Sequence, residues 1–130
     1  MKKALFITLL FFSFQSFSFA GDIPDKIISA FATGNSSQLS EFFNNSIELT
    51  LLEKEDIYSK TQAEMILRDF FAKHPPSKFT IIHKGGKDNS RYAIGDLVSG
   101  ANTYRITFLL KMDGDKVFIH QLRIENDNVE

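Results

Sequence analysis

The spacing of apolar residues predicts three helices and one strand in the first part of the chain. Three segments place apolar residues on one helical face and are bounded by capping and helix-ending residues: 22–34, 36–45 and 61–74. In the last of them, Thr61 and Glu64 have the spacing of a capping box. Residues 47–51 alternate instead between apolar and polar, which indicates a half-buried strand.

Period-two alternation predicts four more strands towards the end of the chain. We expect these strands at residues 79–84, 91–98, 103–112 and 116–125. They are separated by Gly85-Gly86, Gly100 and Asp113-Gly114. Glycine readily adopts the positive φ that tight hairpin turns require, so these separators predict hairpins. Successive hairpins give an antiparallel meander.

The order of these elements predicts an α+β fold. Helices that precede a meander are expected to pack on one face of its antiparallel sheet. A strongly curved antiparallel sheet over three helices is similar to the cone-shaped nuclear transport factor 2-like fold. A cystatin-like fold, with its sheet over one helix, is the alternative, and the two helices before the first strand weigh against it. No repeat or linker divides the chain, so we expect residues 21–130 to form a single domain.

The first twenty residues differ in character from the rest. Lys2-Lys3 precedes an uncharged run from Ala4 to Phe19, and Ala20 follows. This order predicts a secretory signal peptide, residues 1–20, with cleavage after Ala20. A membrane anchor needs about 20 strongly apolar residues, whereas serine and glutamine dilute the second half of this run. We therefore expect a periplasmic or secreted protein with no membrane span after cleavage.

Composition excludes several kinds of site. The 130 residues include no Cys, which excludes disulfides, thiolate zinc sites and thiol nucleophiles. A net charge of -1 gives no support for a nucleic-acid partner. The three His residues stand in different predicted elements, so their spacing predicts neither a metal site nor a cofactor.

Charge is unevenly divided along the chain. Residues 21–72 carry 4 basic and 9 acidic groups, whereas residues 73–124 carry 9 basic and 4 acidic groups. One interpretation is an anion-binding or envelope-binding surface built from Lys78, Lys84, Lys87, Arg91, Arg105 and Lys111. The other, which we favour, is that these are ordinary solvated strand faces and loops.

Projection of the strand alternation gathers five polar side chains on the concave, apolar side of the sheet. Tyr104 shares a face with Ile106, Phe108, Leu110 and Met112, and we take this as the core side. The same projection puts His83, Tyr92, Asp96, Tyr104 and His120 there. Polar groups in an apolar cavity are costly unless they are paired. They predict either a pocket for a small, partly apolar ligand or a set of satisfied core residues.

The position of His120 depends on the hairpin turn at Asp113-Gly114. A two-residue turn puts Gln121 and Arg123 on the face of Tyr104. A three-residue turn puts His120 there instead, because a slip of one residue exchanges the two faces. We favour the longer turn, since it buries the more apolar set of side chains, Phe118, Leu122 and Ile124.

Residues from position 58 onward resemble those of one exported bacterial family, domain of unknown function 4783. The matching residues are Tyr58-Ser59-Lys60, Gln62-Ala63-Glu64, Phe70-Phe71, Phe79, His83, Gly85, Tyr92-Ala93-Ile94-Gly95, Tyr104-Arg105 and Leu122-Arg123-Ile124-Glu125. The resemblance implies export and the cone-shaped fold, but no activity. We therefore expect a ligand-binding or protein-interaction domain of the cell envelope with no catalytic residues. The alternative is a small cone-fold enzyme with an Asp or His base and a Tyr donor.

Apolar residues on the outer face of the predicted sheet suggest self-association. The five residues concerned are Ile82, Leu97, Leu109, Val117 and Ile119. Contiguous apolar patches usually mark contact with another surface, so we expect a two-fold homodimer that packs sheet against sheet. The alternative is a monomer in which another part of the same chain covers the patch.

Overall fold

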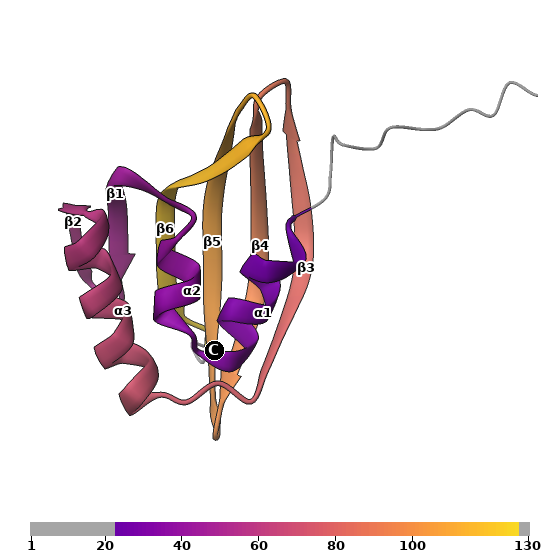
Figure 1. The fold of residues 1–130 in the computed structure, drawn as a ribbon. Coiled ribbons are helices and arrows are strands. Elements are labelled where there is room, and N and C mark those ends of the chain that lie inside the picture. Colours follow the sequence, from indigo (N-terminus) through magenta and orange to yellow (C-terminus); the bar gives the residue numbers. More distant parts are fainter. Residues whose placement is uncertain (1–22, 128–130) are drawn as a thin grey trace, which may run out of the picture.

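The computed structural model describes residues 23–127 and contains three helices and six strands there (Figure 1). The helices are α1 (Asp25–Thr33), α2 (Ser36–Ser40) and α3 (Lys60–Lys73). The strands are β1 (Phe43–Leu51), β2 (Lys54–Ser59), β3 (Lys78–Lys87), β4 (Ser90–Ser99), β5 (Asn102–Asp113) and β6 (Lys116–Asn126). The predicted signal peptide, residues 1–20, and its cleavage site lie outside the described residues.

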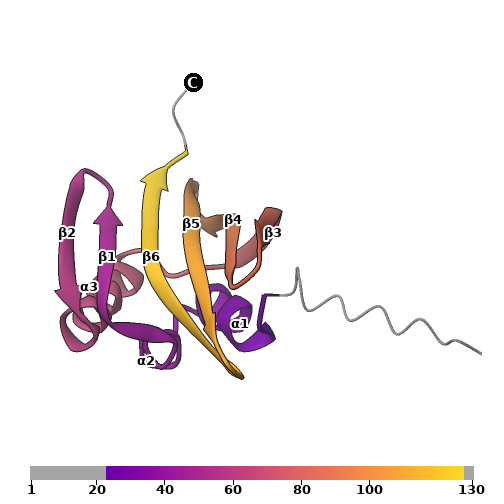
Figure 2. The same cartoon turned by 90° about the horizontal axis from the view of Figure 1, so that it is seen from above.

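The six strands form one sheet in the order β2-β1-β6-β5-β4-β3. Strands β3 to β6 make the predicted antiparallel meander, and β1 joins β6 in parallel. The sheet is curved and all three helices lie on one side of it (Figure 2). The predicted α+β fold is therefore confirmed, and three helices do not fit the one-helix cystatin-like alternative. We call the side packed on the helices the helix-covered face and the other side the open face.

The capping residue at the start of α3 is Ser59, two residues before the predicted capping residue Thr61. The Ser59 hydroxyl accepts a hydrogen bond from the Gln62 amide at 3.2 Å, and the Gln62 side chain accepts one from the Ser59 amide. This is a capping box, but not the predicted Thr61–Glu64 pair. Glu64 is instead buried and accepts a bond from Arg68 at 2.6 Å. The helix ends before Pro75-Pro76, as predicted.

The second predicted helix is much shorter in the structure. α2 spans only Ser36–Ser40, and the Asn35 side chain caps it by accepting from the Gln38 amide at 2.9 Å. Residues 43–45, which we expected at the helix end, already belong to β1. The longer strand aligns with β6, because Phe43 pairs with Ile119.

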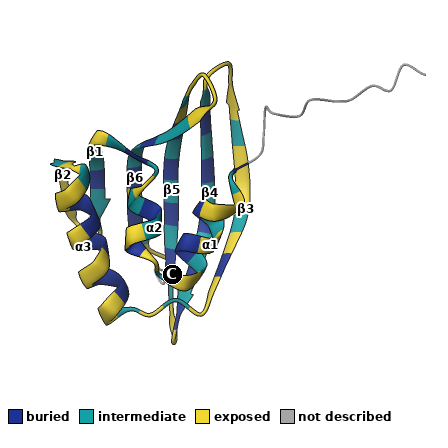
Figure 3. Ribbon diagram, in the orientation of Figure 1, coloured by how far each residue is buried: buried dark blue, intermediate teal, exposed yellow. Residues whose placement is uncertain are grey.

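The core lies between the helices and the sheet, where both carry buried residues (Figure 3). It is rich in aromatic side chains. The ring centroid of Phe31 on α1 lies 4.9 Å from that of Phe79 and 5.3 Å from that of Phe108. Tyr104, Phe108 and Leu110 are buried as predicted. The space under α1 is thus filled by side chains from β3 and β5.

On β4, the prediction of which side chains face the core is wrong. Arg91, Ala93, Gly95, Leu97 and Ser99 are the buried set, and the alternate residues lie on the open face. Our prediction put the alternate residues Tyr92, Ile94, Asp96 and Val98 on the core side by projecting the strand alternation. In the middle of this strand the buried residues are the small Ala93 and Gly95, and the Phe79 ring lies directly against Gly95.

Two β-bulges place both predicted strand histidines on the open face. Ile82 is the extra residue in β3, so that Ile81 pairs with Gly95 and His83 with Ile94. In β6 the extra residue is His120, because Leu109 pairs with Gln121 and Leu110 with Ile119. The predicted core positions of His83 and His120 are therefore wrong.

The last hairpin follows neither of the two turns that we considered. Asp113 pairs with Lys116 around a Gly114-Asp115 loop. Leu122 and Ile124 are buried as expected, but Ile119 takes the core position that we assigned to Phe118. The apolar set that we assigned to the outer face changes as well. Leu97 and Ile119 are fully buried and Val117 packs against the core, whereas Ile82 and Leu109 lie on the open face.

Candidate functional site

The five predicted pocket residues do not meet in one pocket. His83, Tyr92, Asp96 and His120 lie on the open face, whereas Tyr104 is buried on the helix-covered face. His83, Tyr92 and Asp96 each form a hydrogen bond with another side chain, and so does Tyr104. His120 lines a separate hollow.

His83 and Tyr92 form a pair across β3 and β4. The His83 Nε2 atom lies 3.0 Å from the Tyr92 hydroxyl, and the two ring centroids are 5.7 Å apart. The Tyr92 ring covers Gly85, its direct neighbour on β3, where a Cβ atom would lie 2.6 Å from the hydroxyl oxygen. The ring thus shields a glycine in an edge strand, which stabilises the strand.

Asp96 is held by Arg105 on the neighbouring strand. The Arg105 Nε atom donates to the Asp96 carboxylate at 3.0 Å, and its Nη2 atom donates to Asp127 at 3.1 Å. The hydrogen bond to Asp96 raises the pKa of Arg105, with a further increase from Asp127. Because Asp96 is held in this ion pair, it is poorly placed to act as a general base.

Tyr104 anchors the end of α3 to the sheet. Its hydroxyl lies 3.1 Å from the His74 Nδ1 atom at the end of the helix. The Phe70 ring meets both residues, with centroids 5.2 Å from Tyr104 and 4.9 Å from His74. This cluster of rings is part of the packing between α3 and β5.

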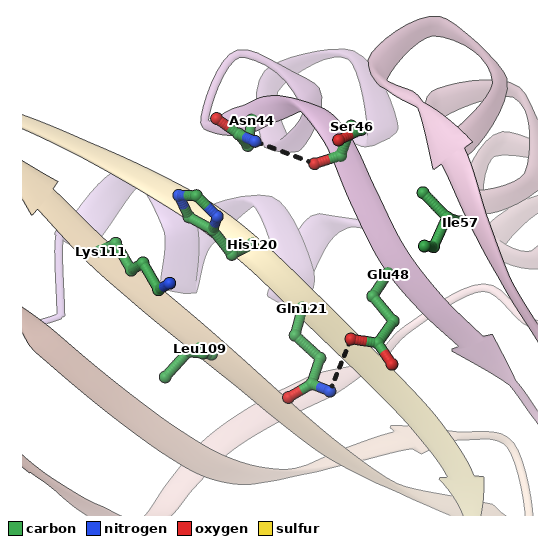
Figure 4. Close-up of a pocket in the computed structure, with 8 residues that line it drawn as sticks. All are labelled: Asn44, Ser46, Glu48, Ile57, Leu109, Lys111, His120 and Gln121. Atoms are coloured by element: carbon green, nitrogen blue, oxygen red, sulfur yellow. Dashed lines mark hydrogen bonds between the residues drawn. The ribbon is translucent and has the colours of Figure 1, made fainter.

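His120 lines a hollow on the open face, at the junction of β1, β5 and β6 (Figure 4). The hollow has a volume of about 280 Å³. Eight residues line it: Asn44, Ser46, Glu48, Ile57, Leu109, Lys111, His120 and Gln121. The bulge at His120 directs the imidazole and the neighbouring Gln121 to the same side of the sheet. We take this hollow as the candidate functional site.

Opposite charges lie on two sides of the hollow. Lys111 on β5 and Glu48 on β1 face each other across it, with His120 and Gln121 between them (Figure 4). The Gln121 Nε2 atom donates to the Glu48 carboxylate at 3.2 Å, which positions that carboxylate. Burial, together with the positive charge of Lys111, lowers the pKa of His120 below its ordinary value of 6.5. At neutral pH the imidazole is therefore uncharged and can both donate and accept a hydrogen bond.

Among the residues that line this hollow, the sequence analysis named His120 as a pocket residue and Lys111 as part of a possible anion-binding or envelope-binding surface. Glu48 and Gln121 are neighbours because β1 pairs with β6 in parallel. These two residues are 73 positions apart, and no local pattern indicates such a pairing. The only available signal was the polar side of the alternating strand at residues 47–51, which does contain Glu48.

Two further findings concern residues 23–127. Within this range, no three His, Cys, Asp or Glu side chains are grouped so that they could hold a metal ion. None of the helices described there has the length and apolar character needed to cross a membrane.

The solved structures that are similar to this chain include two proteins of one family and a third of lower sequence identity. A DUF4783 family protein from Bacteroides ovatus is 31% identical with a TM-score of 0.78, over 82% of this chain and 97% of that one. Its counterpart from Bacteroides uniformis is 29% identical with a TM-score of 0.77, over 83% and 100%. The protein Rd1NTF2_04 with long sheet shares only 17% identity, with a TM-score of 0.64 over 77% and 94%, and shows the fold alone. No curated protein matches the chain.

One protein-family model matches nearly all of the described residues. The model, described as domain of unknown function (DUF4783), matches residues 24–125. The residues that suggested this family also have structural roles, such as the Ser59–Gln62 capping box and the Tyr92 ring over Gly85. The chain therefore belongs to the DUF4783 family.

Proposed function

We propose that this chain is an exported binding domain of the bacterial cell envelope, which takes a small, partly apolar molecule in the hollow and catalyses no reaction. The pairing of the candidate acid and base residues is the observation that carries this proposal. Asp96 bonds to Arg105, His83 to Tyr92, and Tyr104 to His74. None of these six residues lines the hollow, which is formed by a different set of side chains.

The lining of the hollow defines the chemistry of its ligand. Glu48 can accept hydrogen bonds from an ammonium group, and Lys111 can donate to a carboxylate. Leu109 and Ile57 add aliphatic surface. A ligand with an amine, an acid group and an aliphatic part satisfies all of these groups. An aliphatic amino acid or a short peptide has this composition.

Calorimetric titration of residues 21–130 tests the proposal directly. Leucine and glycyl-leucine are compared with 4-methylpentanoate, which lacks the amine, and 3-methylbutylamine, which lacks the acid group. We expect a zwitterion to bind at least about tenfold more tightly than either single-charge analogue, because each analogue leaves one charged side chain unpaired.

Two variants locate the binding site. Glu48→Gln should weaken binding of the zwitterion by removing the partner of the amine, and Lys111→Met by removing the partner of the acid group. Lys26→Met, on the exposed side of α1, is the matched control. Absence of binding, or binding that neither substitution in the hollow changes, would reject the proposal.

The enzyme alternative has less support. A cone-fold isomerase or cyclase needs an Asp or His base that faces bound substrate, with a Tyr donor opposite. Here Tyr92 and Asp96 lie on the open face of β4, outside the hollow, and Tyr104 lies on the other face of the sheet. His120 lines the hollow without a tyrosine beside it.

A second proposal, self-association, is favoured by the two edges of the open face. Ile57 on β2 is 69% exposed and Ile82 on β3 is 49% exposed. By register, Glu55 shares this face with Ile57, whereas Lys78 and Lys87 share it with Ile82. In this arrangement two copies pack open face against open face around a two-fold axis. The axis runs parallel to the strands at the centre of the sheet, between β5 and β6, so that β2 of one copy lies over β3 of the other. Glu55 at the β2 edge of one copy would then meet Lys78 and Lys87 at the β3 edge of the other, and this charge complementarity favours a homodimer.

Sedimentation equilibrium tests the homodimer. We expect a dimeric mass at tens of micromolar for residues 21–130. Ile57→Lys should give a monomer, because it places a positive charge against the basic edge of β3. Met65→Lys changes another exposed apolar residue, which is 58% exposed on α3, and serves as the control. A monomeric mass for the unmodified chain would reject this arrangement.

A further inference from the structure

Arg91 is a buried cation on the helix-covered face of β4. The residue is only 8% exposed. Its Nη1 atom donates to the Ser90 carbonyl at 2.8 Å, but its buried Nε atom has no hydrogen-bond partner. Among residues 23–127, no carboxylate forms an ion pair with this guanidinium. Arginine stays protonated in proteins, and an unpaired buried charge is costly. Arg91 is therefore a buried cation that no carboxylate of the described residues neutralises.

The neighbours of Arg91 on this face supply no negative charge. Gly86 on β3 and Leu110 on β5 lie directly across from it. Ala93 follows two residues later on the same face, and its partner across the strands is Lys84. The register positions beside Arg91 on this face thus hold no carboxylate.

The position of Arg91 in the sheet leaves it near an end that the helices do not cover. Arg91 is the second residue of β4, next to the hairpin from β3. The β3–β4 and β5–β6 hairpins extend beyond α1 and α2 at this end of the molecule (Figure 1). A small molecule could approach from the hairpin end without displacing a helix.

We propose that Arg91 anchors a binding site for a small oxyanion, a carboxylate or a phosphate group, at the hairpin end of the helix-covered face. A guanidinium binds such groups through two parallel N–H bonds, and its unpartnered Nε–H supplies one of them. This site is independent of the hollow, because the two lie on opposite faces of the sheet.

The Nε–H resonance of Arg91 gives a direct test by ¹H–¹⁵N NMR. Residues 21–130 are titrated separately with sodium phosphate and sodium acetate, and sodium chloride keeps the ionic strength constant. We expect the Arg91 resonance to shift and saturate with at least one oxyanion, and the tighter response identifies the class. The Arg105 Nε–H already donates to Asp96 and serves as the internal control, since it should not show a saturable shift.

Thermal denaturation of a variant supplies the second measurement. The same oxyanion should raise the Tm of the unmodified chain, and Arg91→Met should abolish that increase. Absence of a saturable shift at Arg91 with either oxyanion would overturn the proposal and leave Arg91 only its bond to the Ser90 carbonyl. An equal gain in Tm for Arg91→Met would also overturn it. If that variant does not fold, the resonance of the unmodified chain decides alone.

Discussion

The ring of Phe79 occupies the space that a side chain at Gly95 would need. A Cβ atom at residue 95 would lie 2.5 Å from the Phe79 Cε1 atom and 3.0 Å from the Thr80 carbonyl oxygen. Gly95 lies in the middle of β4 and pairs with Ile81. The close approach of the ring, and not an unusual backbone conformation, is therefore what requires glycine here.

We expect Gly95→Ala to destabilise the protein by about 1–3 kcal/mol, because the added methyl group forces the Phe79 ring out of position. Urea denaturation measures the change. In the double variant with Phe79→Leu, the cost of the alanine should be smaller, since leucine lacks the ring that it meets. Strictly additive costs would show that the two positions do not interact.

Ser59→Ala should cost about 1 kcal/mol of stability, because it removes the side chain that caps the start of α3. Thr61→Ala is the matched control. Thr61 is an exposed residue inside the helix, so its substitution should change stability by less than about 0.5 kcal/mol. The reverse ranking in urea denaturation would place the cap at Thr61 after all.

The hydrogen bond between His83 and Tyr92 should contribute about 0.5–1.5 kcal/mol. Tyr92→Phe removes the bond but keeps the ring over Gly85, whereas Tyr92→Ala removes both. We therefore expect a clearly larger loss of stability for the alanine variant. A cycle with His83→Ala isolates the bond, and a coupling energy near zero would show that it contributes nothing.

Stability should depend on pH through His120. The pKa of its imidazole is lowered by burial and by Lys111, so the unfolded chain takes up this proton at a higher pH than the folded protein does. Stability therefore falls as the pH drops from above about 6.5, where both states are neutral, to below the lowered pKa of the folded state. His120→Gln should remove this part of the dependence, as measured by urea denaturation across that range. An unchanged pH dependence would contradict the assignment.

Features encoded by neighbouring residues could be predicted from the sequence. The strands β4, β5 and β6 begin and end within one residue of their expected positions, because alternation and flanking turn residues are local signals. Gly34 ends α1 with φ 65, as its place after the apolar stripe indicates. The order of helices and strands then limits the fold to few arrangements.

The face of each strand was harder to predict, because it depends on contacts from elsewhere. Projection of the strand alternation put Tyr92 and Ile94 in the core, yet Ala93 and Gly95 are the buried residues, and the Phe79 ring fills the space that a side chain at residue 95 would need. Single bulge residues at Ile82 and His120 then exchange the faces partway along two strands. No composition signal marks either bulge.

The candidate hollow depends on the pairing of β1 with β6, which no local sequence pattern predicts. Glu48 meets Gln121 only because β1 lies parallel to β6, next to the end of the meander. Helices α1 and α2 precede β1 in the chain, and their sequences do not indicate that β1 pairs with β6. The residues of the hollow therefore look like ordinary polar positions of two unrelated strands.

The central place of β6 has a consequence for how the chain folds. β6 is the last strand to be made, and it lies between β1 and β5. Until it is present, the β1–β2 hairpin and the β3–β5 meander have no strand to connect them. Such a long-range closure is slow, because chain entropy is lost before the contacts form. Folding of this sheet therefore finishes only after Lys116–Asn126 has been synthesised, because only β6 joins the β1–β2 hairpin to the β3–β5 meander.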